Sequence, residues 1–406
     1  MSVSRRLFLI GSAISAAVPL ERARAASATP LRFMADTPAL YRDIFAFGIS
    51  ALKALRPEID VELTWTQDYT QTLQQSLRDR LVGQGPDIAL HAHNNIAVLA
   101  KRAAIVPIDN LVDGGNGKIS SAIGQVAGRQ FAIPFSASVP VVYVNRDVIG
   151  KSTALPMTFE AILSVASKVN APSGGAFFNY ATDGSWTFMA LIESLGGRIV
   201  NEGSDDIAFD SPEGLEAMEI LAGFAEVRKG QTLTASQARQ AFASGAIGIH
   251  VDTTSRMRFF EEQAQGKFEL AILPFPLKKT DKARIPPSGG SLAIMAQDKE
   301  RQKAAAYLLQ SLLTLGVQEE IMAKTGFIPG LAASGGFAAL EASLKASPHF
   351  DAIAPTLAVL GPWASFPVEN PARVDKAVQD ALGELAAQKA TAKQTLERIV
   401  SAARQA

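Results

Sequence analysis

Four aromatic side chains lie beside turn residues or near the ends of predicted strands, with carboxylates and an amide in similar places. Sugars present hydroxyl groups and flat C–H faces, so a sugar site needs an aromatic surface for stacking and nearby hydrogen-bonding groups. The aromatic candidates are Trp65, Tyr69, Trp186 and Trp363, and the polar candidates are Asp36, Asn94, Asp183 and Asp252. Trp186 and Trp363 are the first choices because turn residues flank both, while packing in the core is an alternative of at least equal weight for each aromatic.

Two histidines, His91 and His93 in "HAHNN", lie on one face of a predicted strand end. They could be two ligands of a metal ion or half of the metal site of a hydrolase. Only His250 and His349 remain as further histidines, and the zinc spacing H-E-x-x-H is absent. We therefore expect the pair to be polar lining of a cleft, and we expect neither a metal nor another cofactor.

The sequence motifs of nucleotide-binding and hydrolytic enzymes are incomplete. "GKS" at 150–152 ends like a P-loop, but Asn145 occupies the position of its first glycine. "GGNG" at 114–117 does not make G-x-G-x-x-G, and no G-x-S-x-G occurs. Paired carboxylates such as Glu261 and Glu262 lie in polar runs that are typical of solvated faces. We expect a protein that is not an enzyme.

Composition limits the class of protein further. The 406 residues are 48% hydrophobic, which is enough for a substantial core and for two or three domains. Basic and acidic side chains each number 39, without a basic stripe, so nucleic acid is not an expected partner. The chain has no cysteine, which rules out a disulfide framework, a thiolate metal site and a cysteine nucleophile.

The N-terminal residues 1–25 have the features of an export signal. Arg5 and Arg6 precede an apolar stretch, and Ala23-Arg24-Ala25 forms an A-x-A cleavage site. "SRRLFL" closely resembles the twin-arginine motif, which implies export of a folded chain. The apolar stretch is shorter than the roughly 20 residues of a spanning helix, so we expect no membrane anchor. Cleavage would leave 35 basic and 38 acidic side chains.

Hydrophobic patterns after the signal alternate between strand and helix. Strands are expected at 31–36, 59–66 and 86–92, with helices at 38–55, 69–83 and 94–104. Strands separated by single helices indicate right-handed crossovers and a largely parallel sheet covered on both faces. The fold class is therefore α/β, with a doubly wound first lobe.

A second alternation follows residue 150 and indicates a second α/β lobe. Strands are expected in "GGAFFNY", "GAIGIHVD" and "FELAILPFP", and helices in the segments between the first two and before them. A polar connector then leads to strand "SLAIMA", to a helix with Asp298 as N-cap, and to a mostly helical end. No internal repeat is present.

The stretch "FAIPFSASVPVVYVN" at 131–145 interrupts two strand-like runs with small hydroxyl residues between Pro134 and Pro140. We interpret it as a crossing between the lobes, where a hinge could rotate as the lobes close on a ligand in an interlobe cleft. The expected organisation is a signal at 1–25, a first lobe from 26–138 and 277–329, and a second lobe from 139–276 and 330–406.

Several landmarks in a fixed order resemble the extracellular solute-binding proteins, family 1, of ABC import systems. They are "YTQTLQQSLRDRLVGQGPDIAL", "LAKRAAIVPID", "RQFAIPFSASVPVVYVNRDVI", "AFASGAIGIHVDTTS", "LPFP", "SGGSLAIM" and "KTGFIPG", which span nearly the whole mature chain. The resemblance implies a type II periplasmic-binding fold. It also implies a monomer that binds a carbohydrate, a polyol or a glycerol-phosphate-like solute in the periplasm and hands it to permease subunits.

The resemblance also implies a set of ligand-binding positions, by comparison with the glycerol-phosphate binders. Tyr69 and Ser138 match, Thr253 or Thr254 lies where serines stand, and Gly289 and Gly290 form the glycine pair. Arg373 corresponds to an arginine that binds phosphate. Two departures concern His93, which replaces an acidic residue, and Phe327, which replaces a tyrosine and so lacks a hydroxyl donor.

Three functions remain open at this point. A transport receptor would bind its solute reversibly, whereas a periplasmic lyase or hydrolase acting on a saccharide would consume it. A ligand sensor for a signalling receptor would share the same fold and differ in its surface partners. We favour the transport receptor because an export signal accompanies the ordered landmarks.

Overall fold

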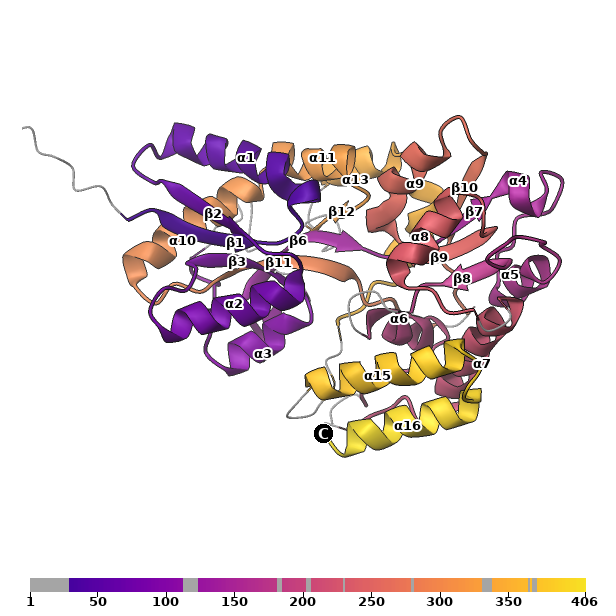
Figure 1. Ribbon diagram of the computed structural model, residues 1–406. Helices are drawn as coiled ribbons and strands as arrows, with labels where there is room; N and C mark the ends of the chain where they lie inside the picture. Colours follow the sequence, from indigo (N-terminus) through magenta and orange to yellow (C-terminus); the bar gives the residue numbers. More distant parts are fainter. Residues whose placement is uncertain are drawn as a thin grey trace, which may run out of the picture.

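The computed structural model describes residues 29–111, 123–180, 185–201, 206–228, 231–278, 281–330, 338–363, 366 and 371–406. Within these residues the chain forms two α/β lobes, joined near the middle of the molecule (Figure 1). The expected signal at 1–25 and the candidate Asp183 lie outside the described residues.

The first lobe is built on a six-stranded sheet in the order β12-β6-β11-β3-β1-β2. Its strands are β1 (Leu31–Ala35), β2 (Val61–Trp65), β3 (Ile88–Ala92), β6 (Ala132–Ser138), β11 (Ser288–Ile294) and β12 (Ile328–Pro329), and a small hairpin of β4 (Gln125–Val126) and β5 (Arg129–Gln130) precedes β6. The strands β1, β2 and β3 are parallel, as predicted. In contrast, β11 is antiparallel to both of its neighbours, β3 and β6.

Helices cover both faces of this sheet. They are α1 (Pro38–Leu55), α2 (Tyr69–Leu81), α3 (Asn95–Lys101), α10 (Lys299–Leu312) and α11 (Leu315–Lys324). Side chains alternate along β1, so that Phe33 packs in the cluster with α1 and α10, and Met34 packs in the cluster with α3. The predicted N-cap of α10 is confirmed, because the Asp298 carboxylate accepts hydrogen bonds from the N–H groups of Glu300 and Arg301 at 3.0 Å.

The second lobe is built on a four-stranded sheet in the order β10-β7-β9-β8. Its strands are β7 (Pro140–Asn145), β8 (Ala176–Phe178), β9 (Ile249–Thr253) and β10 (Leu270–Pro274). Only β8 and β9 pair in parallel, whereas β7 is antiparallel to both β9 and β10. The antiparallel pairing of β7 follows from its position, because β7 enters the sheet directly from the other lobe and not through a helical crossover.

The helices of the second lobe include a C-terminal group. They are α4 (Arg146–Ile149), α5 (Phe159–Ala166), α6 (Trp186–Ser194), α7 (Pro212–Val227), α8 (Ala235–Ala243), the 3-10 turn η1 (Thr254–Arg256), α9 (Met257–Ala264), α14 (Phe350–Leu357), α15 (Pro371–Ala386) and α16 (Ala392–Arg404). In this group α14 packs against β10, and α15 and α16 pack against α7. Apolar side chains of α15 and α16, including Val374, Val378 and Ile399, belong to the core of this lobe.

Three segments of the chain run between the two sheets. The first is a single residue, Val139, between β6 and β7, where the predicted lobe boundary falls. The second joins β10 to β11, and the third contains α13 (Ala338–Lys345), which packs against α11 of the first lobe and precedes α14 of the second. None of the helices among the described residues combines the length and apolar character that a membrane span needs.

Candidate ligand-binding site

The backbone of the glycine pair in β11 approaches its neighbours closely. Gly289 has φ +130°, and a Cβ atom there would lie 2.2 Å from the carbonyl oxygen of Ser136. At Gly290 a Cβ atom would lie 3.0 Å from the hydroxyl oxygen of Tyr69. The two glycines therefore let β6, and the hydroxyl of Tyr69 at the start of α2, lie close to β11.

His93 follows β3 and is tied to the same part of β11. Its N–H donates to the Gly289 carbonyl at 3.1 Å, and its Nδ1 lies 2.7 Å from the Ser291 hydroxyl. Burial lowers the pKa of His93 to about 3, while the Ser136 backbone has a smaller opposing effect. The imidazole is therefore neutral at physiological pH and can offer hydrogen bonds without charge.

His91 does not join His93 in a metal site among the described residues. Its Nε2 lies 3.5 Å from the sulfur of Met295, and burial lowers its pKa to about 4. No group of three or more histidine or acidic side chains in the described part of the chain is arranged to hold a metal ion.

The crossing between the sheets is held by Thr254, which immediately follows β9. The Thr254 N–H donates to the Val139 carbonyl at 2.9 Å, and the Val139 N–H donates to the Thr254 hydroxyl at 3.3 Å. Ser138 precedes Val139 and lies opposite Ser288 of β11. Two predicted ligand residues, Ser138 and Thr254, are thus brought together, one on each side of the boundary between the sheets.

An aromatic pair connects Phe327 to the same crossing. The Phe327 ring stacks on Tyr41 of α1 with a centroid distance of 5.6 Å, and the Tyr41 hydroxyl lies 2.7 Å from that of Ser136 in β6. Gly326 lies against the other lobe, since a Cβ atom there would be 1.8 Å from the Thr254 carbonyl oxygen. Tyr41 was not predicted as a site residue, because its spacing fits the apolar face of a helix. Ser136 was not predicted as one either, although it lies in the stretch assigned to the crossing.

The second lobe holds Asp252 in an internal network. Its carboxylate accepts from Arg239 at 2.7 and 3.2 Å, from Asn179 at 3.1 Å and from the Thr253 N–H at 2.8 Å, and it lies 3.1 Å from His250 Nε2. Burial alone would raise the pKa of Asp252, but the His250 hydrogen bond and the Arg239 charge outweigh it and hold this pKa well below its usual range. In this conformation the carboxylate is already engaged inside the lobe.

The tryptophans of the second lobe pack against protein. Trp186 is fully buried, and its indole N–H donates to the Pro286 carbonyl at 2.7 Å, so it presents no face for stacking in this conformation. Trp363 is half-buried against the core of the second lobe.

The remaining predicted residues lie outside this cluster or at its margin. Arg373 is exposed in the first turn of α15. Asp36 is buried after β1, where it accepts a hydrogen bond from the Thr37 hydroxyl at 3.0 Å. Asn94 is half-buried before α3, next to His93. The structure therefore groups Tyr69, His93, Gly289 and Gly290 on the first lobe and places Ser138, Thr254 and Phe327 at the boundary.

The sequence matches a family of binding proteins. The family model described as "Bacterial extracellular solute-binding protein" matches residues 51–352. The chain is similar to a maltotriose-binding protein of Pyrococcus abyssi, with 22% identity over 68% of this chain and 61% of that protein. The match thus spans about three fifths of that relative's length. The chain is also similar to the sn-glycerol-3-phosphate-binding periplasmic protein UgpB of Yersinia pseudotuberculosis, with 21% identity over 68% of each.

Solved structures show the same fold at low sequence identity. UgpB from Mycobacterium tuberculosis in complex with glycerophosphocholine superposes with a TM-score of 0.77 and 18% identity, covering 93% of this chain and 98% of that one. A cyclic alpha-maltosyl-1,6-maltose binding protein from Arthrobacter globiformis has a TM-score of 0.76 and 16% identity, with the same coverage. The fold is that of the type II periplasmic binding proteins, as predicted.

Proposed function

Because the chain belongs to the bacterial extracellular solute-binding proteins, we propose that it captures a carbohydrate or polyol-type solute between its two lobes and delivers it to the permease of an ABC importer. The family description is one of binding, which agrees with the expectation that the protein is not an enzyme. Twin-arginine export of the folded chain to the periplasm, and action as a monomer, are parts of the same proposal that rest on the sequence.

One observation supports the proposal most strongly: uncharged hydrogen-bonding groups meet where β3 and β11 lie next to the crossing. The Tyr69 hydroxyl lies over Gly290, and the neutral His93 imidazole is fixed against Gly289 and Ser291. Hydroxyl and neutral imidazole groups can donate to and accept from ligand hydroxyls without requiring a ligand charge. A solute rich in hydroxyl groups fits this chemistry.

Binding would proceed by closure of the lobes. The first crossing consists of Val139 alone, so a small change in its backbone angles reorients β7 relative to β6. A solute that touches both lobes binds the closed form more tightly and so increases its population. The permease would then recognise the closed form.

Arg373 decides between two subclasses of solute. If α15 approaches the first lobe on closure, the guanidinium can hold a phosphate with two parallel hydrogen bonds. If the ligand is neutral, Arg373 contributes little to binding. The structure places the side chain at the exposed start of α15, on the second lobe.

The proposal is tested by a thermal-shift screen of residues 26–406 against neutral mono- and oligosaccharides, polyols, sugar phosphates and glycerol phosphodiesters. A solute that binds only the folded state raises the Tm with increasing concentration. Chromatography of the solute after incubation shows whether it is recovered intact. Recovery of an unchanged solute supports the proposal, whereas its consumption, or the absence of any shift across the panel, overturns it.

A further inference from the structure

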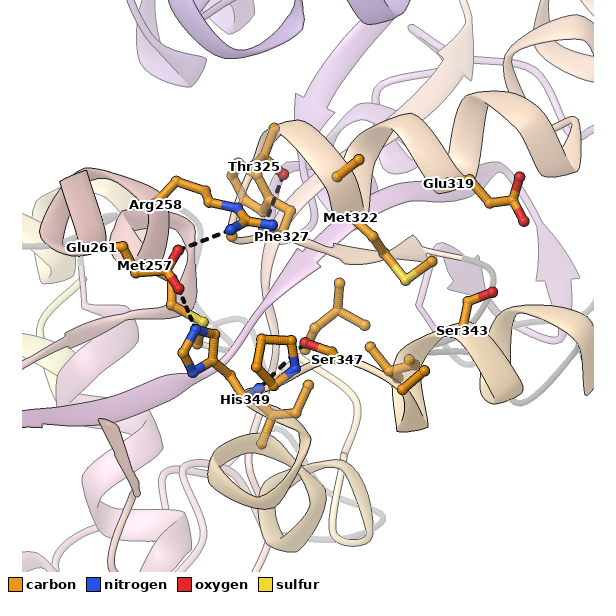
Figure 2. A pocket seen from close by; sticks show the side chains of 17 residues that line it. Met257, Arg258, Glu261, Glu319, Met322, Thr325, Phe327, Ser343, Ser347 and His349 are labelled. Carbon is orange, nitrogen blue, oxygen red and sulfur yellow. Dashed lines mark hydrogen bonds and ion pairs between the residues drawn. The ribbon is translucent and has the colours of Figure 1, made fainter. Parts of the chain in front are cut away.

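A hollow lies beside the crossing, between elements of both lobes (Figure 2). Its volume is about 320 Å³, and its walls come from α9 of the second lobe, α11 and β12 of the first, and the α13–α14 segment. In Figure 1, α9, α11 and α13 lie above the crossing strands, whereas α6 and α15 lie below them. The hollow is therefore separate from the place where Arg373 of α15 could meet the first lobe.

The larger part of the lining of the hollow is apolar. Met257 from α9 and Met322 from α11 face it from the two lobes (Figure 2). Leu344 and Ile353 also belong to its apolar lining. Thioether side chains are flexible and polarizable, so they adapt to ligands of different shape. A pocket of this volume lies at the lower end of the range for small-molecule sites, roughly 300–1,000 Å³.

Charged groups occupy one end of the hollow. Arg258 donates to Glu261 at 3.0 Å, and the His349 imidazole is hydrogen-bonded to the same carboxylate. That hydrogen bond is the largest influence on Glu261 and lowers its pKa, against the effect of partial burial. Glu261 is therefore ionised, and its charge is already balanced by Arg258.

A second carboxylate, that of Glu319, lies at the exposed rim of the hollow, on α11. Within the described part of the chain Glu319 takes part in no ion pair, whereas its neighbour Glu320 is paired with Lys324 at 2.7 Å. Arg258 is the ion-pair partner of Glu261, so Glu319 is the carboxylate of the lining that has no ion pair among the described residues.

From this combination we propose that the hollow is a second small-molecule site, and that its ligand is a primary ammonium on a short linear alkyl chain. The alkyl chain would pack between Met257 and Met322, and the ammonium would lie beside Glu319 at the rim. A neutral ligand could fill the apolar part but would leave the charge of Glu319 without a partner. An anionic ligand would be repelled by the unpaired carboxylate of Glu319.

The site can be observed directly through its methionines. Residues 26–406 contain seven methionines, so 13C-methyl labelling of methionine gives few signals in the NMR spectrum. Titration of residues 26–406 with n-hexylammonium chloride should shift the signals of Met257 and Met322 along one saturable curve, with the Met34 signal in the first-lobe core unchanged. Met257→Leu and Met322→Leu assign the two signals.

Matched variants test the role of charge. Glu319→Gln should weaken n-hexylammonium binding by up to about fivefold, the upper end of the range expected for an exposed ion pair. Glu320→Gln removes a neighbouring carboxylate on the same helix and should leave the affinity unchanged. The proposal is overturned if the Met257 and Met322 signals do not move, if n-hexanol binds as tightly as the amine, or if the two variants behave alike.

The residues that line the hollow connect it to the proposed solute site, so we expect binding at the two sites to be coupled. This expectation rests on the proposed function. Phe327 belongs to the hollow and stacks on Tyr41, which bonds Ser136 in β6. Saturating solute should change the n-hexylammonium affinity, and the amine should change the solute affinity by the same factor. Unchanged affinity in the presence of bound solute would overturn the coupling alone. If no solute binds in the thermal-shift screen, that result counts against the proposed function. The methionine titration would still show whether n-hexylammonium binds in the hollow.

Discussion

Thr254 holds both backbone polar groups of Val139. The Thr254 N–H donates to the Val139 carbonyl at 2.9 Å, and the Thr254 hydroxyl accepts from the Val139 N–H at 3.3 Å. Val139 is the one residue between β6 and β7, so this pair of bonds fixes the end of the second sheet against the chain that enters it. The Thr254 hydroxyl accepts from Val139 and keeps its own proton available for donation.

Thr254→Val should lower the free energy of unfolding by about 1–3 kcal/mol, because the Val139 N–H would be left buried without its acceptor. Thr254→Ser keeps the oxygen and serves as the control, with a smaller loss. Urea denaturation followed by circular dichroism measures both. Equal losses for the two variants would contradict the role of the hydroxyl.

Gly289→Ala should destabilise the first lobe by at least about 2 kcal/mol, since the added Cβ would meet the Ser136 carbonyl oxygen at 2.2 Å. The matched control is Gly383→Ala in α15, where nothing lies within 4 Å of the added atom. That substitution should raise stability by about 0.5–1 kcal/mol because alanine favours a helix interior. The Tm of the two variants should thus move in opposite directions.

Asp252→Asn should cost about 3 kcal/mol, because it removes the charge that Arg239 and His250 face in a buried network. Asp210→Asn removes an exposed partner of Arg404 and should cost less than about 1 kcal/mol. Titration of the solute into folded Asp252→Asn tests whether this carboxylate also binds the ligand. Unchanged solute affinity would show that the Asp252 carboxylate has a structural role only. A tenfold loss of affinity would show that it also contributes to ligand binding.

Protonation of buried histidines should make the fold sensitive to acid. Burial lowers the pKa of His93 to about 3 and that of His91 to about 4, from 6.5 in the unfolded chain. At a pH between the folded-state pKa and 6.5, each histidine binds a proton in the unfolded state but not in the folded state. The free energy of unfolding therefore has its full value above pH 6.5 and falls as the pH drops toward 4. Each histidine contributes at most about 1.4 kcal/mol per pH unit.

The acid sensitivity is measured by urea denaturation at several pH values between 7.5 and 4, a range chosen to bracket most of both titrations. His93→Gln should reduce the slope of stability against pH without removing it, since His91 still contributes. A slope that is identical in the variant and the parent would show that His93 is accessible to protons in the folded state.

Arg373→Gln distinguishes the two solute subclasses. It should weaken a phosphorylated solute about tenfold or more, because a bidentate charged contact is lost, and it should leave a neutral sugar unaffected. Lys376→Gln, an exposed cation on the same helix, is the control. Isothermal titration with the solute found in the thermal-shift screen gives the affinities. If both variants weakened binding equally, the positive charge of α15 would act on the solute as a general electrostatic attraction, without a specific contact from Arg373.

The positions of helices and strands were predicted from the sequence more successfully than the parallel or antiparallel pairing of the strands. Strict alternation of strands and helices located β1, α1, β2, α2 and β3, since apolar periodicity is a local property. The antiparallel insertion of β11 between β3 and β6 depends on chain segments more than 150 residues apart, and no local pattern encodes it. The helix α8 was not anticipated as a separate element.

Side-chain roles were predicted less well than positions. Turn residues beside Trp186 suggested an accessible indole, but the turn determines where the chain reverses and not which way the ring points, and the ring is buried on Pro286. The pairing of Tyr41 with Ser136 joins residues 95 positions apart, so it could not be derived from spacing. The ligand roles of Tyr69, His93, Ser138 and Thr254 remain predictions that the titrations above can decide.

The division of each lobe among distant chain segments has a consequence for synthesis. The sheet of the first lobe needs β11 and β12, and the core of the second needs α15 and α16. Translation must therefore pass residue 329 before the first sheet is complete, and it must pass residue 404 before the second core closes. A truncated nascent chain would expose apolar faces of both lobes to chaperones, and no single contiguous fragment could be expressed as an intact lobe.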